Sequence, residues 1–211
     1  MASGDEIPSK EEGRLLHKDV AGDLQVIASL IDMRMTVLEE EESLQVLREV
    51  RSLIQSMALA HGTIYEGGSG GRISARRLME KLMKSTRLTH CTRTWIETVV
   101  DAGTVQLPAG VAVPLALAVS ECIRESVVCS LKGMTEGRII VTVREDDTGF
   151  TITVADSGRS GYDMVMDDDE AALGMMVADH IVHYRLKGIL ERDAGDGASR
   201  VIRFPKRAPA R

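Results

Sequence analysis

Aromatic side chains are scarce, with two Phe, three Tyr and one Trp in 211 residues. Proteins that hold single-stranded nucleic acid stack its bases on aromatic rings, and this chain has few such rings to offer. Basic residues do not balance the acidic ones either, and the formal net charge is -6. Because a negative protein repels the phosphate backbone, we expect no nucleic-acid partner.

Long apolar runs and paired cysteines are also missing. The longest apolar run, VAVPLALAV, is about half of what a membrane span needs, and it contains Pro114. The opening MASGDEIPSKEEG is polar and acidic, without the apolar centre of a signal peptide. Cys91, Cys122 and Cys129 lack the CxxC spacing of a zinc site or a disulfide framework. We therefore expect a soluble, cytoplasmic protein with no membrane partner.

Two segments near the N-terminus have apolar residues at steps of three and four, the spacing of an amphipathic helix. The first stripe is Leu16, Val20, Leu24, Ile27, Ile31, Met35 and Leu38. The second is Leu47, Val50, Ile54, Met57, His61 and Ile64, with Ser43 as its expected N-cap. After a disordered segment over residues 1–12, residues 13–66 are therefore predicted to form an antiparallel helical hairpin.

A hairpin with two apolar stripes cannot enclose a core by itself. We expect a homodimer in which two hairpins form a four-helix bundle, and packing onto the rest of the same chain is the alternative. The glycines of GGSGG, residues 67–71, indicate a flexible joint to a second domain.

The second domain, residues 72–205, mixes helical and strand patterns and is followed by a tail over residues 206–211. Alternating apolar residues in RIIVTVRE and GFTITVAD flank the turn signal DDTG, which predicts a β-hairpin. The other expected elements are helices near 75–85, 113–131 and 170–187, and strands near 94–100 and 199–205. Helices on one face of a mainly antiparallel sheet make an α+β sandwich.

Several strings, in this order, resemble the two-component histidine kinases. LQVIASLIDMR and MALAHGTIY are similar to the dimerisation and phosphoacceptor hairpin of the second HisKA subfamily. PLALAVSECIRESVV resembles the N-box of a GHKL-type (Bergerat) ATPase domain, and VADSGRSG and AALGMMVADHIV resemble its two glycine boxes. The resemblance spans residues 14–205 and implies a Bergerat-type α/β sandwich after the hairpin.

The resemblance implies a phosphoacceptor histidine in the first helix, and His17 is the histidine available there. Such a residue must be neutral and exposed to attack phosphorus in line. Gly13 and Ala21, one turn away on a helix, are small and are expected to leave the ring open. When the sequence is aligned with the family on LQVIAS, Lys18 occupies the position of the family's histidine, and His17 lies one residue earlier. We interpret His61 as a hydrogen-bonded core histidine without a catalytic role.

The resemblance also implies a nucleotide site. By resemblance, Glu121 is the acidic residue that acts on the nucleophile, Glu125 the Mg²⁺ ligand and Asp156 the carboxylate that binds adenine. Gly158 and Gly161 are the glycines expected beside the base, and Gly174 is the glycine expected beside the phosphates. Glu125 replaces the family's asparagine, and the lid over residues 162–171 carries five acidic residues, each costing about 1 kcal/mol near a triphosphate. We therefore assign no cofactor, and ATP with Mg²⁺ stays open.

The hairpin matches the family better than the nucleotide site does. We therefore favour a histidine phosphotransfer protein that exchanges a phosphoryl group between His17 and the aspartate of a response-regulator receiver domain. An ATP-dependent histidine kinase without a sensor, and a non-catalytic pseudokinase scaffold that binds a regulator, are the alternatives. His180 and His183 lack a third ligand, so no metal site is predicted.

Overall fold

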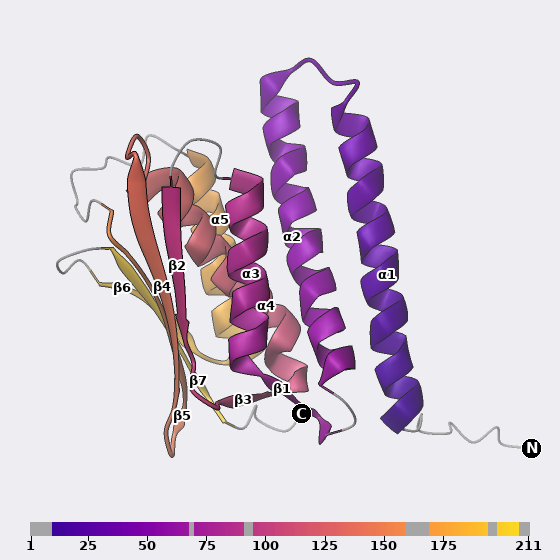
Figure 1. The fold of residues 1–211 in the computed structure, drawn as a ribbon, viewed down its shortest axis with the longest axis vertical. Helices are drawn as coiled ribbons and strands as arrows, with labels where there is room; N and C mark the ends of the chain where they lie inside the picture. Colours follow the sequence, from indigo (N-terminus) through magenta and orange to yellow (C-terminus); the bar gives the residue numbers. More distant parts are fainter. Residues whose placement is uncertain (1–9, 68–69, 91–94, 159–168, 194–197, 207–211) are drawn as a thin grey trace, which may run out of the picture.

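The computed structural model describes residues 10–67, 70–90, 95–158, 169–193 and 198–206 (Figure 1). Helix α1, Lys10–Met35, and helix α2, Glu41–Glu66, run antiparallel and form the expected hairpin. The expectation for Ser43 is wrong: Glu40 is the N-cap of α2, and the Ser43 hydroxyl donates to Glu40 Oε2 at 2.6 Å. Two glutamates in the first turn complement the helix dipole, so α2 begins before Ser43.

A five-stranded sheet follows the hairpin, in the order β2-β4-β5-β7-β6. Its β2–β4 pair is parallel and its other pairs are antiparallel. The strands are β2 Trp95–Asp101, β4 Glu136–Glu145, β5 Gly149–Asp156, β6 Ile189–Asp193 and β7 Ser199–Pro205. Two further short strands, β1 Arg72–Ser74 and β3 Gln106–Pro108, pair with each other. The sequence patterns missed β1, β3 and β6, of which two have three residues.

Three helices cover one face of the sheet: α3 Ala75–His90, α4 Ala112–Glu125 and α5 Asp169–Ile181 (Figure 1). The apolar segment expected as one helix to residue 131 is α-helical only to Glu125, and a π-helical turn continues over Ser126–Ser130. A second π-helical turn, Val182–Leu186, extends α5. The predicted α+β fold is confirmed, and its core lies between these helices and the sheet.

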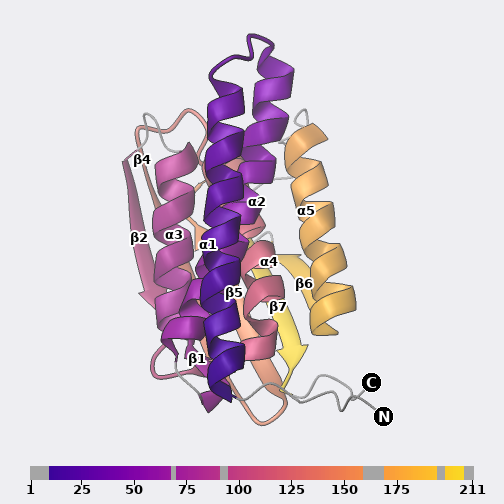
Figure 2. The same cartoon turned by 90° about the vertical axis from the view of Figure 1, so that its right-hand side faces the viewer.

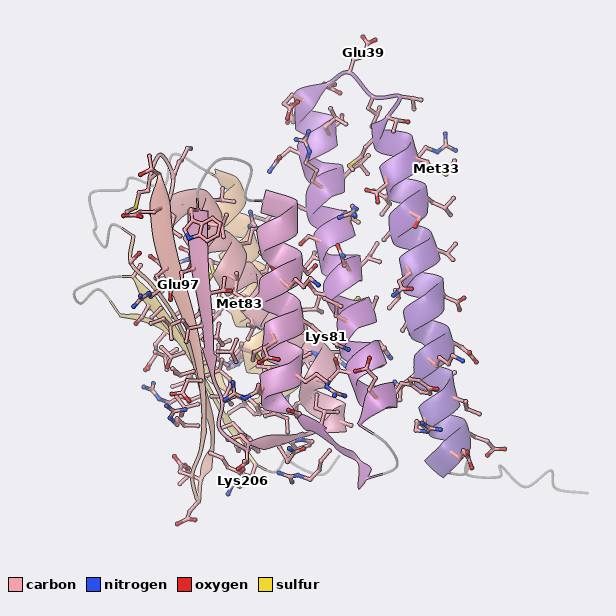
Figure 3. All side chains as sticks on the ribbon, viewed as in Figure 1. Met33, Glu39, Lys81, Met83, Glu97 and Lys206 are labelled. Atoms are coloured by element: carbon pink, nitrogen blue, oxygen red, sulfur yellow. The ribbon has the colours of Figure 1, made fainter. Side chains whose placement is uncertain are left out.

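The hairpin does not stand apart from the sandwich. Helix α2 packs on α3 and α4 through mostly small residues, and α1 lies outside it as a further layer (Figures 1 and 2). The buried members of α2 are Ser52, Ser56, Ala58, Ala60, Thr63 and Ile64. Lys81 of α3 ties the two parts together by an ion pair of 2.8 Å to Glu66, and Figure 3 shows it between the helices.

The outer side of α1 carries apolar side chains that no other described element covers. Leu16, Ile27 and Leu30 are exposed, although Leu16 and Ile27 belong to the stripe expected to be buried. Met33, labelled in Figure 3, also lies on this outer side. The stripe is split because α2 covers only one side of α1 within this chain. Among the described residues, none of the helices is long and apolar enough to span a membrane.

Candidate functional site

His17 faces the second helix of the hairpin. Its Nδ1 lies 2.8 Å from Nδ1 of His61, with ring centroids 5.0 Å apart and planes tilted by 40°. Both rings are half-buried. The expectation of a fully open His17 ring is therefore wrong on the side toward α2, because residue 17 falls on the face of α1 that packs against that helix. The hydrogen bond expected for His61 is present, and its partner is His17 itself.

Burial lowers the pKa of His61, and the nearby His17 lowers it further. Both effects disfavour the imidazolium form, so a neutral His61 ring is favoured near pH 7. Two cations lie at the same end of the hairpin, one turn of α1 apart. The Arg14 guanidinium is 4.9 Å and the Lys18 ammonium 5.8 Å from the centre of the Tyr65 ring.

Glu121 is bound to an arginine. Its Oε2 accepts from Nε of Arg124 at 2.9 Å, and Nη1 of the same guanidinium lies 3.4 Å from Oε1 of Glu49 on α2. Burial works against the charge of Arg124, but Glu121 and Glu49 outweigh it and raise the Arg124 pKa. Glu49 stands twelve residues from His61 on α2, about 18 Å along the axis. The structure therefore does not bring Glu121 to His17 within one chain.

Glu125 and Asp156 do meet, through Arg200 of β7. Arg200 donates from Nε to Glu125 Oε2 at 2.8 Å and from Nη1 to Asp156 Oδ2 at 2.5 Å. Its remaining contacts are the hydroxyls of Ser126 at 2.8 Å and Ser130 at 3.0 Å. Burial works to lower the pKa of Arg200, but the two carboxylates outweigh burial and raise it. The guanidinium thus links four side chains in the fork geometry that suits carboxylates.

The other carboxylate oxygens in this cluster have neighbours too. Asp156 Oδ1 accepts the Gly158 backbone N–H at 2.9 Å, and the Asp156 side chain has no exposed surface. Glu125 Oε1 lies 3.8 Å from the Arg192 guanidinium. The adenine-binding role predicted for Asp156 needs an oxygen that can accept from a base, and the Mg²⁺ role of Glu125 needs one open to a hard cation. In the structure the Arg200 guanidinium binds both groups instead.

The predicted glycines are packed against protein atoms. A Cβ at Gly158 would collide with the carbonyl of Ser130, so this glycine allows the loop to approach the π-helical turn. A Cβ at Gly174 would collide with the Arg124 guanidinium and with Glu121 Oε2. Gly161 and the lid residues 162–168 lie outside the described part of the chain.

Replacing Gly174 by alanine is expected to lower the free energy of unfolding by about 1–3 kcal/mol, because the added methyl must push apart the Arg124–Glu121 pair. Gly22 in α1 is the matched control, since nothing lies near a Cβ there. The same change at Gly22 should raise the free energy of unfolding by about 0.5–1 kcal/mol. Urea denaturation of both variants measures the difference, and equal effects at the two sites would contradict the packing of α5 on this pair.

Arg200 and Arg124 are the functional residues that sequence reasoning missed. Arg200 shares its strand face with Ile202 and Phe204, both buried, so the period-two alternation places a charge among core residues. That pattern was a usable signal, because a buried arginine requires anionic partners. Arg124 likewise sits in a helix whose other residues are nearly all buried.

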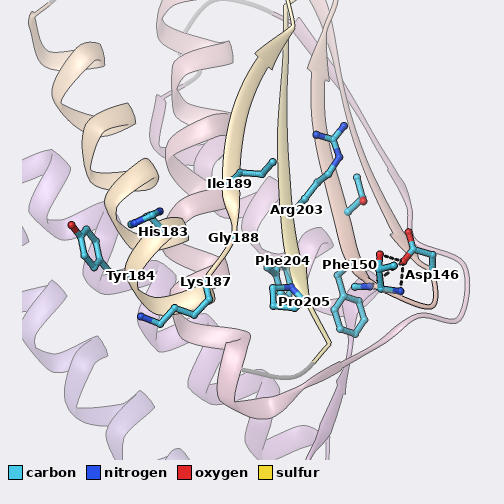
Figure 4. Close-up of a pocket in the computed structure, with 13 residues that line it drawn as sticks. Asp146, Phe150, His183, Tyr184, Lys187, Gly188, Ile189, Arg203, Phe204 and Pro205 are labelled. Carbon is cyan, nitrogen blue, oxygen red and sulfur yellow. Dashed lines mark hydrogen bonds between the residues drawn. The ribbon is translucent and has the colours of Figure 1, made fainter. Parts of the chain in front are cut away.

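A hollow of about 700 Å³ lies elsewhere, at the β4–β5 turn, the end of β7 and the turn after α5 (Figure 4). His183, Tyr184, Lys187, Arg203 and Phe204 are among the residues that line it. It contains none of the predicted site residues. His180 and His183 each pack on Tyr184, and the described residues contain no group of three metal-ligating side chains.

Residues 16–90 match the family model HisKA_2, described as histidine kinase. The fold is that of histidine kinases. The blue-light activated histidine kinase of Erythrobacter litoralis EL346 aligns with 97% of this chain at TM-score 0.68 and 16% identity. The chain covers 62% of that protein, less than two thirds. Its kinase domain alone aligns at TM-score 0.63 and 17% identity, over 87% of this chain and 95% of the domain.

Acinetobacter baumannii histidine kinase AdeS gives a TM-score of 0.53 at 14% identity, over 88% of this chain and 96% of that one. A search of curated protein sequences gives no match. The family match over the hairpin and the fold over nearly the whole length agree. Residues 16–90 are thus similar to the histidine kinase family, and nearly the whole chain has the fold of histidine kinases.

Proposed function

We propose that the protein is a histidine phosphotransfer protein that exchanges a phosphoryl group between His17 and a receiver-domain aspartate without using ATP. The observation that carries this proposal is the Arg200 cluster. Arg200 binds both carboxylates that a nucleotide and its Mg²⁺ would need. Removing a buried guanidinium from two carboxylates would leave uncompensated charge, so ATP and Mg²⁺ would have to replace strong internal pairs.

The surroundings of His17 support a role in accepting a phosphoryl group. Imidazole is a good nucleophile near neutral pH when one nitrogen carries a lone pair. Arg14 and Lys18 place two positive charges at the same end of the hairpin, and each is able to attract an aspartyl phosphate. A response-regulator receiver domain in the cytoplasm is therefore the partner that we propose.

We further propose that the protein acts as a homodimer through the outer face of α1. The dimer would bury Leu30 and Ile27, which are 55% and 44% exposed in the single chain, and would complete the expected four-helix bundle.

Replacing Leu30 by lysine is expected to convert the dimer to a monomer at micromolar concentration, because a charge cannot be buried there without a partner. Leu173→Lys on α5, where the leucine is equally exposed at 55%, is the matched control and should leave the dimer intact. Sedimentation equilibrium measures both. A wild-type monomer, or dimers in both variants, would contradict the proposed interface.

The test of the proposed function supplies two phosphoryl donors in parallel. Wild-type protein is incubated with a labelled, phosphorylated receiver domain or with labelled ATP and Mg²⁺. We expect acid-labile, base-stable label from the receiver and none from ATP. Label from ATP would establish the kinase alternative.

One observation favours the scaffold alternative, namely that the His17 ring is half-buried against His61 rather than fully open. A scaffold would bind the receiver and take label from neither donor. That result would overturn the proposed function while leaving the fold and the family similarity in place.

A further inference from the structure

The contact between His17 and His61 constrains the positions of their protons, and this inference rests on the proposed function of His17. A hydrogen bond between two Nδ1 atoms at 2.8 Å requires one nitrogen to carry a proton and the other to offer a lone pair. Which nitrogen of a neutral imidazole is protonated is set by the bond that the other makes.

Two arrangements satisfy the contact. If His61 donates, His17 accepts at Nδ1 and its proton sits on Nε2, which then has no lone pair to attack phosphorus. If His17 donates, its Nε2 keeps a lone pair and lies outside the contact with His61. Only the second arrangement makes His17 a nucleophile.

We propose that His61 is a positioning residue: its Nδ1 accepts the Nδ1–H of His17 and thereby holds Nε2 of His17 as the attacking atom. The link runs between helices, since the two histidines are 44 residues apart in the sequence. It fixes the ring orientation as well as the tautomer, as the orienting partner of a catalytic histidine does in hydrolase triads.

The charge state of His61 agrees with this role. An acceptor must be neutral, and burial together with the neighbouring His17 disfavours the protonated ring. Both effects keep a lone pair on Nδ1 of His61.

The Nε2 lone pair of His17 attacks the phosphorus of the receiver's aspartyl phosphate, so an N–P bond forms and the P–O bond to the aspartate breaks. The aspartate leaves as a carboxylate with the electron pair. The imidazole ring gains positive charge, and its Nδ1 proton moves to or is shared with Nδ1 of His61. The return transfer reverses each of these changes.

Nitrogen-15 NMR of the imidazole rings tests the proton placement before any phosphoryl group is present. At pH 7.5 we expect His17 of the wild type to be in the Nδ1–H form. The His61→Leu variant should shift His17 toward the Nε2–H form that free histidine prefers. It should also slow single-turnover transfer from the phosphorylated receiver by about 10²-fold, with receiver binding unchanged.

His61→Asn separates positioning from structural support, because the amide oxygen can accept at the place of Nδ1. We expect this variant to restore the Nδ1–H form and to recover most of the rate. The inference is overturned if wild-type His17 is in the Nε2–H form, or if His61→Leu transfers at the wild-type rate. If His17→Ala still accepts the phosphoryl group, the proposed function fails instead, whatever the tautomer.

Discussion

Replacing Arg200 by alanine is expected to lower the free energy of unfolding by about 3–5 kcal/mol, since it leaves two buried carboxylates without the cation that binds them. Asp156 has no exposed side-chain surface, and Glu125 is only 11% exposed at its side chain. Ser126 and Ser130 each lose the hydrogen bond from Arg200 in the same change. A loss of this size is a large fraction of the stability of a typical domain.

Arg203 is the matched control, three residues further along the same strand and on its opposite, exposed face. It is 49% exposed and pairs with Glu191, itself exposed, at the surface. Arg203→Ala should cost about 0–1 kcal/mol, the usual contribution of a surface pair. Arg200→Lys keeps the positive charge but loses the forked donor geometry of the guanidinium, so we expect an intermediate loss in the free energy of unfolding. Urea denaturation measures all three, and equal losses at Arg200 and Arg203 would show that the buried cluster does not hold the sheet to α4.

Replacing His17 by alanine is expected to abolish phosphoryl transfer, by at least about 10³-fold, because no other group takes over the attack. The same variant should fold normally, since the side chain is half-buried and lies near the open end of the hairpin. Rapid-quench labelling from a phosphorylated receiver measures the rate, and circular dichroism checks the fold.

Two controls accompany this change. Lys18 occupies the aligned position of the family's histidine, so Lys18→Ala tests whether the residue at that position takes part in the transfer. We expect it to weaken transfer by less than about tenfold, through the loss of one attracting charge. His180→Ala removes an exposed histidine on α5 and should have no effect. Transfer that survives in His17→Ala would place the acceptor elsewhere.

The hairpin was predictable from periodicity because α1 and α2 keep three- and four-residue steps over most of their length. The alternation in β4 and β5 likewise predicted the central strands of the sheet. Strands β1 and β3 could not be found this way, since three residues show no period. Which residues of the α1 stripe are buried within the chain could not be predicted from the sequence. The pattern alone does not distinguish a partner helix in the same chain from a partner helix in a second copy.

The acidic residues of the candidate site were predictable from the sequence, but the arginines that bind them were not. Sequence placed Asp156 and Glu125 in one expected pocket, and the structure brings them together. It did not reveal that Arg200, 75 positions after Glu125, would bind both. The His17–His61 contact depended on the register of the two helices, which short stripes leave undetermined.

Localising the phosphoryl group by tandem mass spectrometry under alkaline conditions tests the central claim most directly. Wild-type protein is treated with a phosphorylated receiver in one reaction and with ATP and Mg²⁺ in another. We expect a phosphorylated imidazole at His17 in the first reaction and unmodified protein in the second. A phosphoryl group on His61 or any other residue, or at His17 from ATP, would contradict it.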